Sequence, residues 1–153
     1  MDTKIASEMG ARLAAQLKAR GVRPDVVVAP AMGGVVIGHE VARGFGCPSI
    51  FTERDGPTMT LRRGFTLTPG EAVVIVEDVV TTGKSTGEVM SVVEASGARV
   101  VGVASLVDRS AGQADFDVPF EALLKIAVET WGGNTCPLCA AGSVAIKPGS
   151  RPS

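Results

Sequence analysis

An apolar run that ends in two neighbouring acids constrains this chain more than any other feature. Residues 73–76 are all β-branched, which is typical of a strand buried on both faces of a parallel sheet. The run ends at Glu77 and Asp78, and a small, hydroxyl-rich turn from Thr81 to Ser85 follows. Open parallel sheets bind ligands at the carboxyl ends of their strands. The sequence therefore predicts a binding site at the end of this strand.

The residues after the strand suit a phosphorylated sugar. Two adjacent carboxylates, Glu77 and Asp78, can accept hydrogen bonds from the two vicinal hydroxyls of a ribose. The turn at 81–85 opens a predicted helix, and backbone N–H groups at a helix N-terminus bind phosphate. In the alternative interpretation the acids only end a strand and cap a helix, which leaves the adjacent pair hard to explain.

Two other phosphate-binding motifs fail on spacing. Residues 83–85 read Gly-Lys-Ser, like the end of a nucleotide-triphosphatase P-loop, but that motif requires a glycine where this chain has Asp78. A dinucleotide fingerprint requires a second glycine two residues after Gly33, and Val35 stands there. Neither class of nucleotide-binding protein is indicated.

Length and composition bound the remaining possibilities. With 153 residues, 45% of them hydrophobic, the chain predicts one domain over 1–153 with a full core. A net charge of −1 and an aromatic content of 4% argue against nucleic acid as a partner. No apolar run reaches membrane-spanning length, and the first residues lack the apolar core of a signal peptide. We therefore expect a cytoplasmic protein without a membrane partner.

The chain alternates between predicted strands and helices. The expected helices cover 3–20, 35–44 and 84–96, and the expected strands cover 25–30, 48–52, 72–77, 99–107 and, as an edge strand, 122–128. A polar stretch at about 53–70 is expected to be a mobile loop. A Cys-containing tail is expected at about 129–153. This order predicts an α/β fold, doubly wound around a mainly parallel sheet with helices on both faces.

Three segments together resemble the type I phosphoribosyltransferases, and among them the orotate phosphoribosyltransferases. They are the run 77–85, the glycine turn 29–34 and the pair Asp108-Arg109, and the resemblance extends over nearly the whole chain. It implies transfer of phosphoribose from phosphoribosyl diphosphate (PRPP) to orotate, giving orotidine 5-phosphate and diphosphate in pyrimidine synthesis. It also implies Mg²⁺ as the cofactor and a homodimer, with no protein residue assigned as a metal ligand.

The resemblance assigns residues to both substrates. Those expected at PRPP are Ala31, Met32, Gly33, Glu77, Asp78, Val79, Val80, Thr81, Thr82, Gly83, Lys84 and Ser85. Thr81 and Arg109 are expected at orotate, because a guanidinium matches a carboxylate with two hydrogen bonds. From the residues alone, a surface salt bridge is an equally good interpretation of Arg109.

Two features depart from the family pattern. Its mobile catalytic loop usually carries lysine and histidine, whereas 53–64 offer only Arg54, Arg62 and Arg63 as catalytic cations. Arginine can stabilise a leaving diphosphate but is a poor proton donor, and the sequence does not select among the three. The family also has an N-terminal hood over the base, and we expect this chain to lack that hood and to react slowly.

The histidine and the cysteines fit no catalytic set. His39 lies in a helical pattern where packing or solvation is expected. Cys136 and Cys139 form one C-x-x-C, half of a four-cysteine zinc site, so a metal would require Cys47 or a partner subunit. A turn with two free thiols is the favoured interpretation, and an odd total of three cysteines fits a reducing compartment.

Alternative functions therefore stay open beside the orotate transferase. The chain could be a regulatory or inactive protein that keeps the PRPP pocket, and a purine phosphoribosyltransferase is a third interpretation. PRPP affinity is expected of all of them, whereas turnover with orotate is expected only of the first.

Overall fold

The computed structural model describes residues 2–129, 131, 132 and 134–144, and its secondary structure follows the predicted alternation. The elements, in chain order, are α1 (Thr3–Ala19), β1 (Val26–Pro30), α2 (Gly33–Phe45), β2 (Ser49–Asp55), β3 (Thr58–Leu61), β4 (Ala72–Val80), α3 (Lys84–Ala95), β5 (Arg99–Asp108), β6 (Phe120–Lys125) and α4 (Pro137–Ala140).

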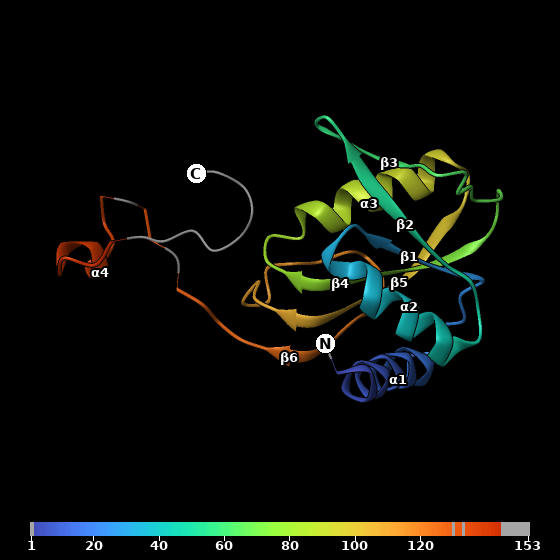
Figure 1. Cartoon of the computed structure of the whole chain (residues 1–153), viewed down its shortest axis with the longest axis horizontal. Helices are drawn as coiled ribbons and strands as arrows, with labels where there is room; N and C mark the ends of the chain where they lie inside the picture. Colours follow the sequence, from blue (N-terminus) through green and yellow to red (C-terminus); the bar gives the residue numbers. More distant parts are fainter. Residues whose placement is uncertain (1, 130, 133, 145–153) are drawn as a thin grey trace.

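Six strands form one sheet in the order β3-β2-β1-β4-β5-β6. The β1–β2, β1–β4, β4–β5 and β5–β6 pairs are parallel, whereas β2 and β3 pair antiparallel. In Figure 1, α3 covers one face of the sheet, and α1 and α2 cover the other. The prediction of a doubly wound, mainly parallel sheet is confirmed.

The central strand β4 separates two hydrophobic cores. Val73 and Ile75 pack in the core beneath α3, together with Val89 of that helix. Val74 and Val76 point the other way, into the core beneath α1 and α2. All four side chains are fully buried. The run of β-branched residues thus fits a strand that is covered on both faces.

The stretch expected to be a mobile loop at about 53–70 contains a hairpin. β2 continues to Asp55, and β3 pairs with it after a turn at Gly56. The hairpin forms because Met59 and Leu61 alternate with polar residues and pack in the core beneath α3. Residues 62–71 follow without regular structure. The loop prediction is wrong for the strand residues, and mobility of the segment stays a prediction.

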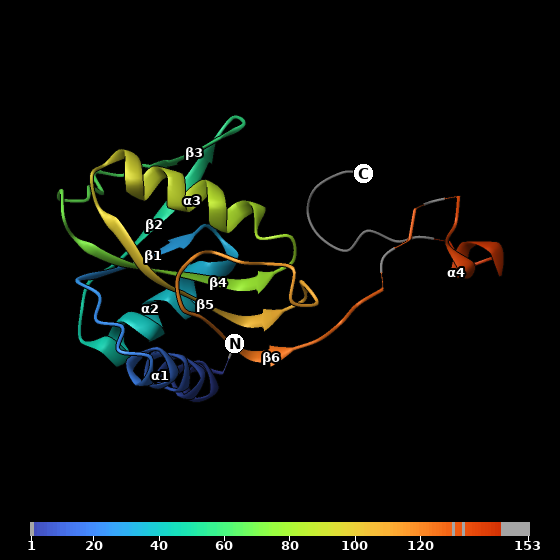
Figure 2. The same ribbon diagram turned by 180° about the vertical axis from the view of Figure 1, so that it is seen from behind.

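In the described part of the tail, a short helix lies away from the sheet. α4 lies beyond the end of β6 and is separated from the sheet in both ribbon views (Figures 1 and 2). The expected edge strand at 122–128 is present as β6 but begins and ends earlier. The last part of the predicted tail, from 145 to 153, lies outside the described residues.

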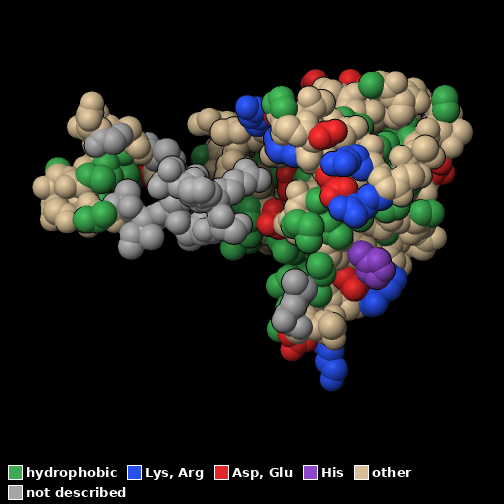
Figure 3. Space-filling view, turned by 45° about the horizontal axis from the view of Figure 1, so that its top comes forward, with side chains coloured by type: hydrophobic (Ala, Val, Ile, Leu, Met, Phe, Trp, Pro, Cys, Tyr) green, Lys and Arg blue, Asp and Glu red, His purple; other side chains and the backbone are tan. Residues whose placement is uncertain are grey.

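Two surface properties bear on possible partners. On the face shown in Figure 3, Lys and Arg side chains lie beside Asp and Glu side chains and form no continuous basic surface. In the described part of the chain, no helix has the length and apolar character needed to cross a membrane.

Candidate functional site

The acid pair lies where β4 approaches the carboxyl edge of the sheet. Glu77 is 7% exposed, and Asp78, which points to the other face, is partly exposed. Burial, followed by the charge of Asp78, raises the pKa of Glu77 to about 7. Ser105 of β5 pairs with Glu77 in register, and it is fully buried without a hydrogen-bond partner among the described residues. The site therefore holds a desolvated carboxyl group whose pKa is close to neutral.

Asp78 meets the start of α2. A Cβ atom placed on Gly33 would lie 2.3 Å from Oδ2 of Asp78, and one on Gly34 would lie 2.7 Å from the carbonyl oxygen of Val76. Only glycine leaves this space for the carboxylate and the strand. The peptide bond between Ala31 and Met32 is cis. The turn after β1 and the end of β4, which are far apart in sequence, thus form one surface.

A polar cavity of about 380 Å³ opens between these segments, which is within the usual range for small-molecule sites. Its lining residues are Pro30, Ala31, Met32, Gly33, Arg54, Met59, Glu77, Asp78, Val79 and Ser85. Most of them were expected at PRPP from the sequence. Pro30, within the expected turn 29–34, and Met59 were not assigned individually, and Met59 could have been found from the apolar alternation of β3.

A smaller polar cavity of about 50 Å³ lies against the turn that begins α3. It shares the lining residues Glu77, Val79 and Ser85 with the larger one, so the two cavities lie side by side. Its lining residues are Glu77, Val79, Val80, Thr81, Thr82, Gly83, Lys84, Ser85 and Thr86. The structure therefore places the expected sugar-binding acids directly beside the expected phosphate-binding turn.

The turn is built around Gly83. This residue has a φ of 74°, in the left-handed region that favours glycine. A Cβ atom there would also lie 3.0 Å from the ring of Phe116. The N–H of Lys84 donates to the hydroxyl of Thr82 over 3.3 Å, and the N–H of Gly87 donates to the Gly83 carbonyl over 2.8 Å. Phe116 supports the turn from the loop after β5, a role that the sequence did not indicate.

The three arginines expected in catalysis do not lie together. Arg54 lines the polar cavity and forms an ion pair with Glu88 of α3. Arg63 instead forms a bidentate pair with Glu53, with distances of 2.7 and 2.8 Å. Glu53 and Arg54 point to opposite faces of the strand, so Arg54 alone among the three reaches the cavity in this conformation.

Arg62 is also turned away from the cavity. Its guanidinium lies 4.0 Å from Asp55, and both side chains are more than half exposed. Their interaction is therefore worth little, because water screens it.

Arg109 follows β5 at the same edge of the sheet. Its N–H donates to the carbonyl of Val80 over 2.7 Å, which places it beside the residue before Thr81. Its side chain is exposed, and no ion pair with it occurs among the described residues. The salt-bridge interpretation of Arg109 thus has no partner in this part of the chain, and its guanidinium is available to a ligand.

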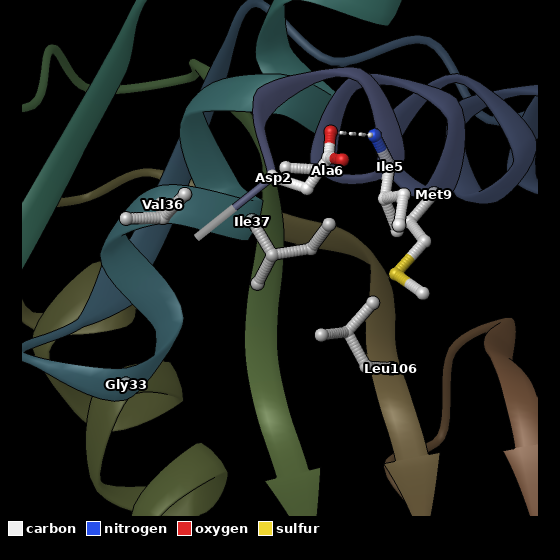
Figure 4. Close-up of a pocket in the computed structure, with 8 residues that line it drawn as sticks. All are labelled: Asp2, Ile5, Ala6, Met9, Gly33, Val36, Ile37 and Leu106. Atoms are coloured by element: carbon white, nitrogen blue, oxygen red, sulfur yellow. Dashed lines mark hydrogen bonds between the residues drawn. The ribbon is translucent and has the colours of Figure 1, made fainter.

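An apolar pocket of about 270 Å³ borders the polar cavity at Gly33, which lines both. Figure 4 shows Ile5 and Met9 of α1 opposite Leu106 of β5, with Asp2 at the start of the helix. Asp2 caps α1 by accepting hydrogen bonds from the N–H groups of Lys4 and Ile5. The wall beside the polar cavity is therefore apolar on the α1 side, a feature that the sequence did not indicate.

A family model for the phosphoribosyl transferase domain matches residues 2–136. An orotate phosphoribosyltransferase of Heliobacterium modesticaldum is 56% identical over 139 residues, which are 91% of this chain and 73% of the relative. One from Sphingopyxis alaskensis is 52% identical over 153 residues, 99% of this chain and 78% of the relative. The chain thus spans about three quarters of the length of these relatives.

Solved structures agree on the fold. Orotate phosphoribosyltransferase of Mycobacterium tuberculosis, in complex with inorganic phosphate, aligns with a TM-score of 0.60 and 26% identity, covering 81% of this chain and 73% of that one. An adenine phosphoribosyltransferase of Thermoanaerobacter pseudethanolicus aligns with a TM-score of 0.67 and 21% identity over 82% of each chain. The second likeness concerns the fold alone.

Proposed function

Because this chain belongs to the orotate phosphoribosyltransferases of the phosphoribosyltransferase family, we propose that it transfers phosphoribose from PRPP to orotate, giving orotidine 5-phosphate and diphosphate. The observation that carries this proposal is that the two polar cavities share Glu77, Val79 and Ser85, which puts the acid pair of β4 beside the glycine turn of α3. The relatives that are about half identical to the chain bear this enzyme name.

PRPP has three parts, and the site offers a matching group for each. The two ribose hydroxyls donate to Glu77 and Asp78, which line the larger cavity. The 5-phosphate accepts from backbone N–H groups of 81–85 around the smaller cavity. The diphosphate lies against the turn after β1, where Gly33 leaves room for close approach of the backbone.

The reaction displaces diphosphate from C1 of the ribose by a ring nitrogen of orotate. The ribose gains positive charge as the bond to the diphosphate breaks, and the diphosphate gains negative charge. The protein accelerates this step by positioning both substrates and by stabilising the leaving group with cations. Arg54 is the hairpin cation that lines the cavity in this conformation, so it is placed to meet the diphosphate.

Selection of orotate rests on Arg109. A guanidinium binds the carboxylate of orotate with two parallel hydrogen bonds, which adenine and hypoxanthine cannot accept in the same way. The backbone bond from Arg109 to Val80 ties this arginine to the strand that also carries the acid pair and leads to Thr81. The base is thereby held next to the sugar that it attacks.

Mg²⁺ is part of the proposal as a partner of PRPP. Among the described residues, no group of three or more His, Cys, Asp or Glu side chains is arranged to hold a metal ion. This is compatible with an ion held by the oxygens of PRPP itself. Bound there, the ion would neutralise charge on the diphosphate, and Arg54 would supply a cation from the protein side.

The assembly and location of the chain complete the proposal. We expect a homodimer, which would cover apolar side chains that are exposed on α1 and α2, such as Ile5 at 52% and Val36 at 42%. A cytoplasmic location fits the chemistry of an enzyme that uses PRPP. Light scattering after size exclusion tests the dimer directly, because a monomer at micromolar concentration would contradict it.

The decisive experiment measures turnover and binding separately. The purified chain is incubated with PRPP, Mg²⁺ and orotate, and orotidine 5-phosphate is followed by its absorbance. Adenine and hypoxanthine replace orotate in parallel reactions, and calorimetry measures PRPP affinity. Turnover with orotate and with neither purine supports the proposal. PRPP binding without turnover would support a regulatory protein, and turnover with a purine would support the third interpretation.

A matched pair of variants shows whether the activity belongs to this site. Asp78→Asn removes one carboxylate of the acid pair, and Glu94→Gln makes the same kind of change at an exposed position of α3 outside both cavities. We expect loss of turnover in the first variant and ordinary turnover in the second. Equal activity of both variants would place the reaction elsewhere.

A further inference from the structure

The C-x-x-C of the tail has no role in the reaction proposed above. Cys136 and Cys139 belong to α4 and its cap, and neither lines the polar or apolar cavities at the sheet. In both ribbon views α4 lies apart from the body of the molecule (Figures 1 and 2). The two thiols are therefore a separate feature that needs its own explanation.

The structure brings the two cysteines together in a single turn. Cys136 is the N-cap of α4, Pro137 occupies the first helical position, and Cys139 lies three residues after the cap. The N–H of Cys139 donates to Sγ of Cys136 over 3.5 Å. Residues three apart on a helical turn have Cβ atoms about 5–6 Å apart, and a disulfide needs about 3.5–4.5 Å. A disulfide therefore requires the two Cβ atoms to approach by about 1–2 Å within the turn.

The same contacts favour the thiolate form of one sulfur. Hydrogen bonds from the backbone and then the thiol of Cys139 lower the pKa of the Cys136 thiol below its usual range. The thiolate is the form that attacks disulfides. Cys47 provides an internal contrast, because burial raises the pKa of its thiol and its S–H donates to the carbonyl of Ala42 over 3.9 Å. Reactivity should therefore differ strongly between the tail and the core.

A metal site is less well supported than a dithiol. Two sulfurs supply only half of a tetrahedral zinc site, and the described residues contain no group of three or more potential ligands. Both sulfurs are accessible, since Cys136 is partly exposed and Cys139 is exposed. The geometry thus fits a pair that reacts with a small molecule from solvent.

We propose that Cys136 and Cys139 form a reversible dithiol–disulfide pair that exchanges with low-molecular-weight disulfides such as oxidised glutathione. The Cys136 thiolate attacks one sulfur of the small disulfide, which forms a mixed disulfide and releases one small thiolate. The Cys139 thiolate then attacks Sγ of Cys136 and releases the second. Two protein thiols are oxidised, one small disulfide is reduced to two thiols, and the two protons of the protein thiols pass through solvent to the released thiolates.

The test uses the full chain in buffers that span ratios of oxidised to reduced glutathione. After acid quenching, free thiols are labelled with a maleimide and counted by intact mass. We expect two of the three thiols to disappear together, with the loss of two hydrogens, while Cys47 is still labelled under unfolding conditions. The reaction should be independent of protein concentration, because both sulfurs belong to one turn.

Single substitutions test the order of attack. Cys139→Ser should stop at a stable mixed disulfide on Cys136, whereas Cys136→Ser should react several-fold more slowly at neutral pH. The labelling rate of Cys136 should also rise at lower pH than that of Cys139 in the Cys136→Ser variant. None of these readouts depends on phosphoribosyl transfer, so they stand whether or not that activity is present.

Three outcomes would overturn the proposal. Both tail thiols could remain free across the whole redox series. The disulfide could instead form between two copies, which non-reducing electrophoresis would show. Purified protein could also carry stoichiometric zinc that blocks labelling until a chelator is added, and that result would establish the metal site in place of the dithiol.

Discussion

Arg54 of β2 forms an ion pair with Glu88 of α3 across the face of the sheet. A second bond, from Nη1 of Arg54 to the carbonyl oxygen of Pro57 over 2.9 Å, holds the same guanidinium against the hairpin turn. Arg54 also lines the polar cavity. The pair therefore holds a cation at the edge of the site, where a diphosphate can compete with Glu88 for it.

Arg54 should matter more for catalysis than Arg63. We expect Arg54→Ala to lower kcat by about 100-fold, the effect of removing one group that stabilises transition-state charge. Arg63→Ala should have little effect in the same assay, because Arg63 pairs with Glu53 on the other face of the hairpin. Steady-state kinetics with saturating PRPP and orotate decide this. A larger loss in Arg63→Ala would mean that the hairpin rearranges in the active complex.

The acid pair should bind the ribose. Glu77→Gln and Asp78→Asn each replace an acceptor by a donor, and a hydrogen bond to a charged group is worth about 1.5–3 kcal/mol. Affinity for PRPP should fall by roughly 10- to 150-fold in each variant. Calorimetric titration with Mg²⁺ and PRPP measures the change, with Glu94→Gln as the control. Unchanged affinity in both site variants would remove the proposed role in ribose binding.

Gly83 should be required for the phosphate turn. Alanine in the left-handed region costs about 1–2 kcal/mol, and at Gly83 the new Cβ would also meet the ring of Phe116 at 3.0 Å. Gly46→Ala is the matched control, since Gly46 has a φ of 79° and open space around it. Both variants should be less stable than the wild type, but only Gly83→Ala should lose affinity for ribose 5-phosphate. Thr82→Ala should lower the affinity for ribose 5-phosphate only slightly. Normal binding by folded Gly83→Ala would place the phosphate elsewhere.

Arg109 should select the base. Arg109→Ala should lower the affinity for orotate by about 10-fold or more, because a charged hydrogen-bonding partner is lost. The affinity for PRPP should stay within about threefold of the wild-type value. Arg109→Lys should restore little of the affinity for orotate, since lysine lacks the bidentate geometry of arginine. Arg99→Ala, an exposed position at the opposite end of β5, serves as the control. Equal losses of orotate and PRPP would indicate a structural role for Arg109.

Glu77 should make stability depend on pH. Its pKa is raised from 4.5 to about 7, so between these values the folded chain binds more protons at this group than the unfolded chain does. The free energy of unfolding should therefore fall as pH rises from 4.5 to 7. Glu77→Gln should remove that fall, and Asp78→Asn should reduce it by removing a neighbouring charge.

Urea unfolding of the wild type, of both site variants and of Glu94→Gln at pH 5 and pH 8 tests this expectation. The difference between the two pH values should be smaller in Glu77→Gln than in the Glu94→Gln control. Identical pH dependence of all four proteins would show that Glu77 ionises normally in the folded state.

Much of the site was visible in the sequence because its parts are local. The acids, the turn and the helix start lie within residues 77–85, and their order alone places them at the end of a buried strand. Glycines at 33 and 34 were likewise recognisable as a turn after a strand. The doubly wound, mainly parallel arrangement followed from the alternation of strands and helices, since right-handed crossovers leave few arrangements.

The hairpin shows why local patterns were insufficient elsewhere. Residues 58–61 form a strand because Met59 and Leu61 pack beneath α3, a helix more than twenty positions away in the chain. The different positions of Arg54 and Arg63 also depend on the pairing of β2 with β3. Arg54 and Arg63 are indistinguishable as cations in the sequence. They are separated because Arg54 and Glu53, the partner of Arg63, point to opposite faces of β2.

The sequence by itself determined the fold class, the central strand and the acid pair and glycine turn that follow it, because strand burial and turn formation depend on residues that are neighbours in the chain. Tertiary structure alone decided which cation reaches the cavity, how Phe116 supports Gly83 and how far burial raises the pKa of Glu77. These properties depend on distances between segments and on the exclusion of water between them, which arise only when the sheet and its helices pack together.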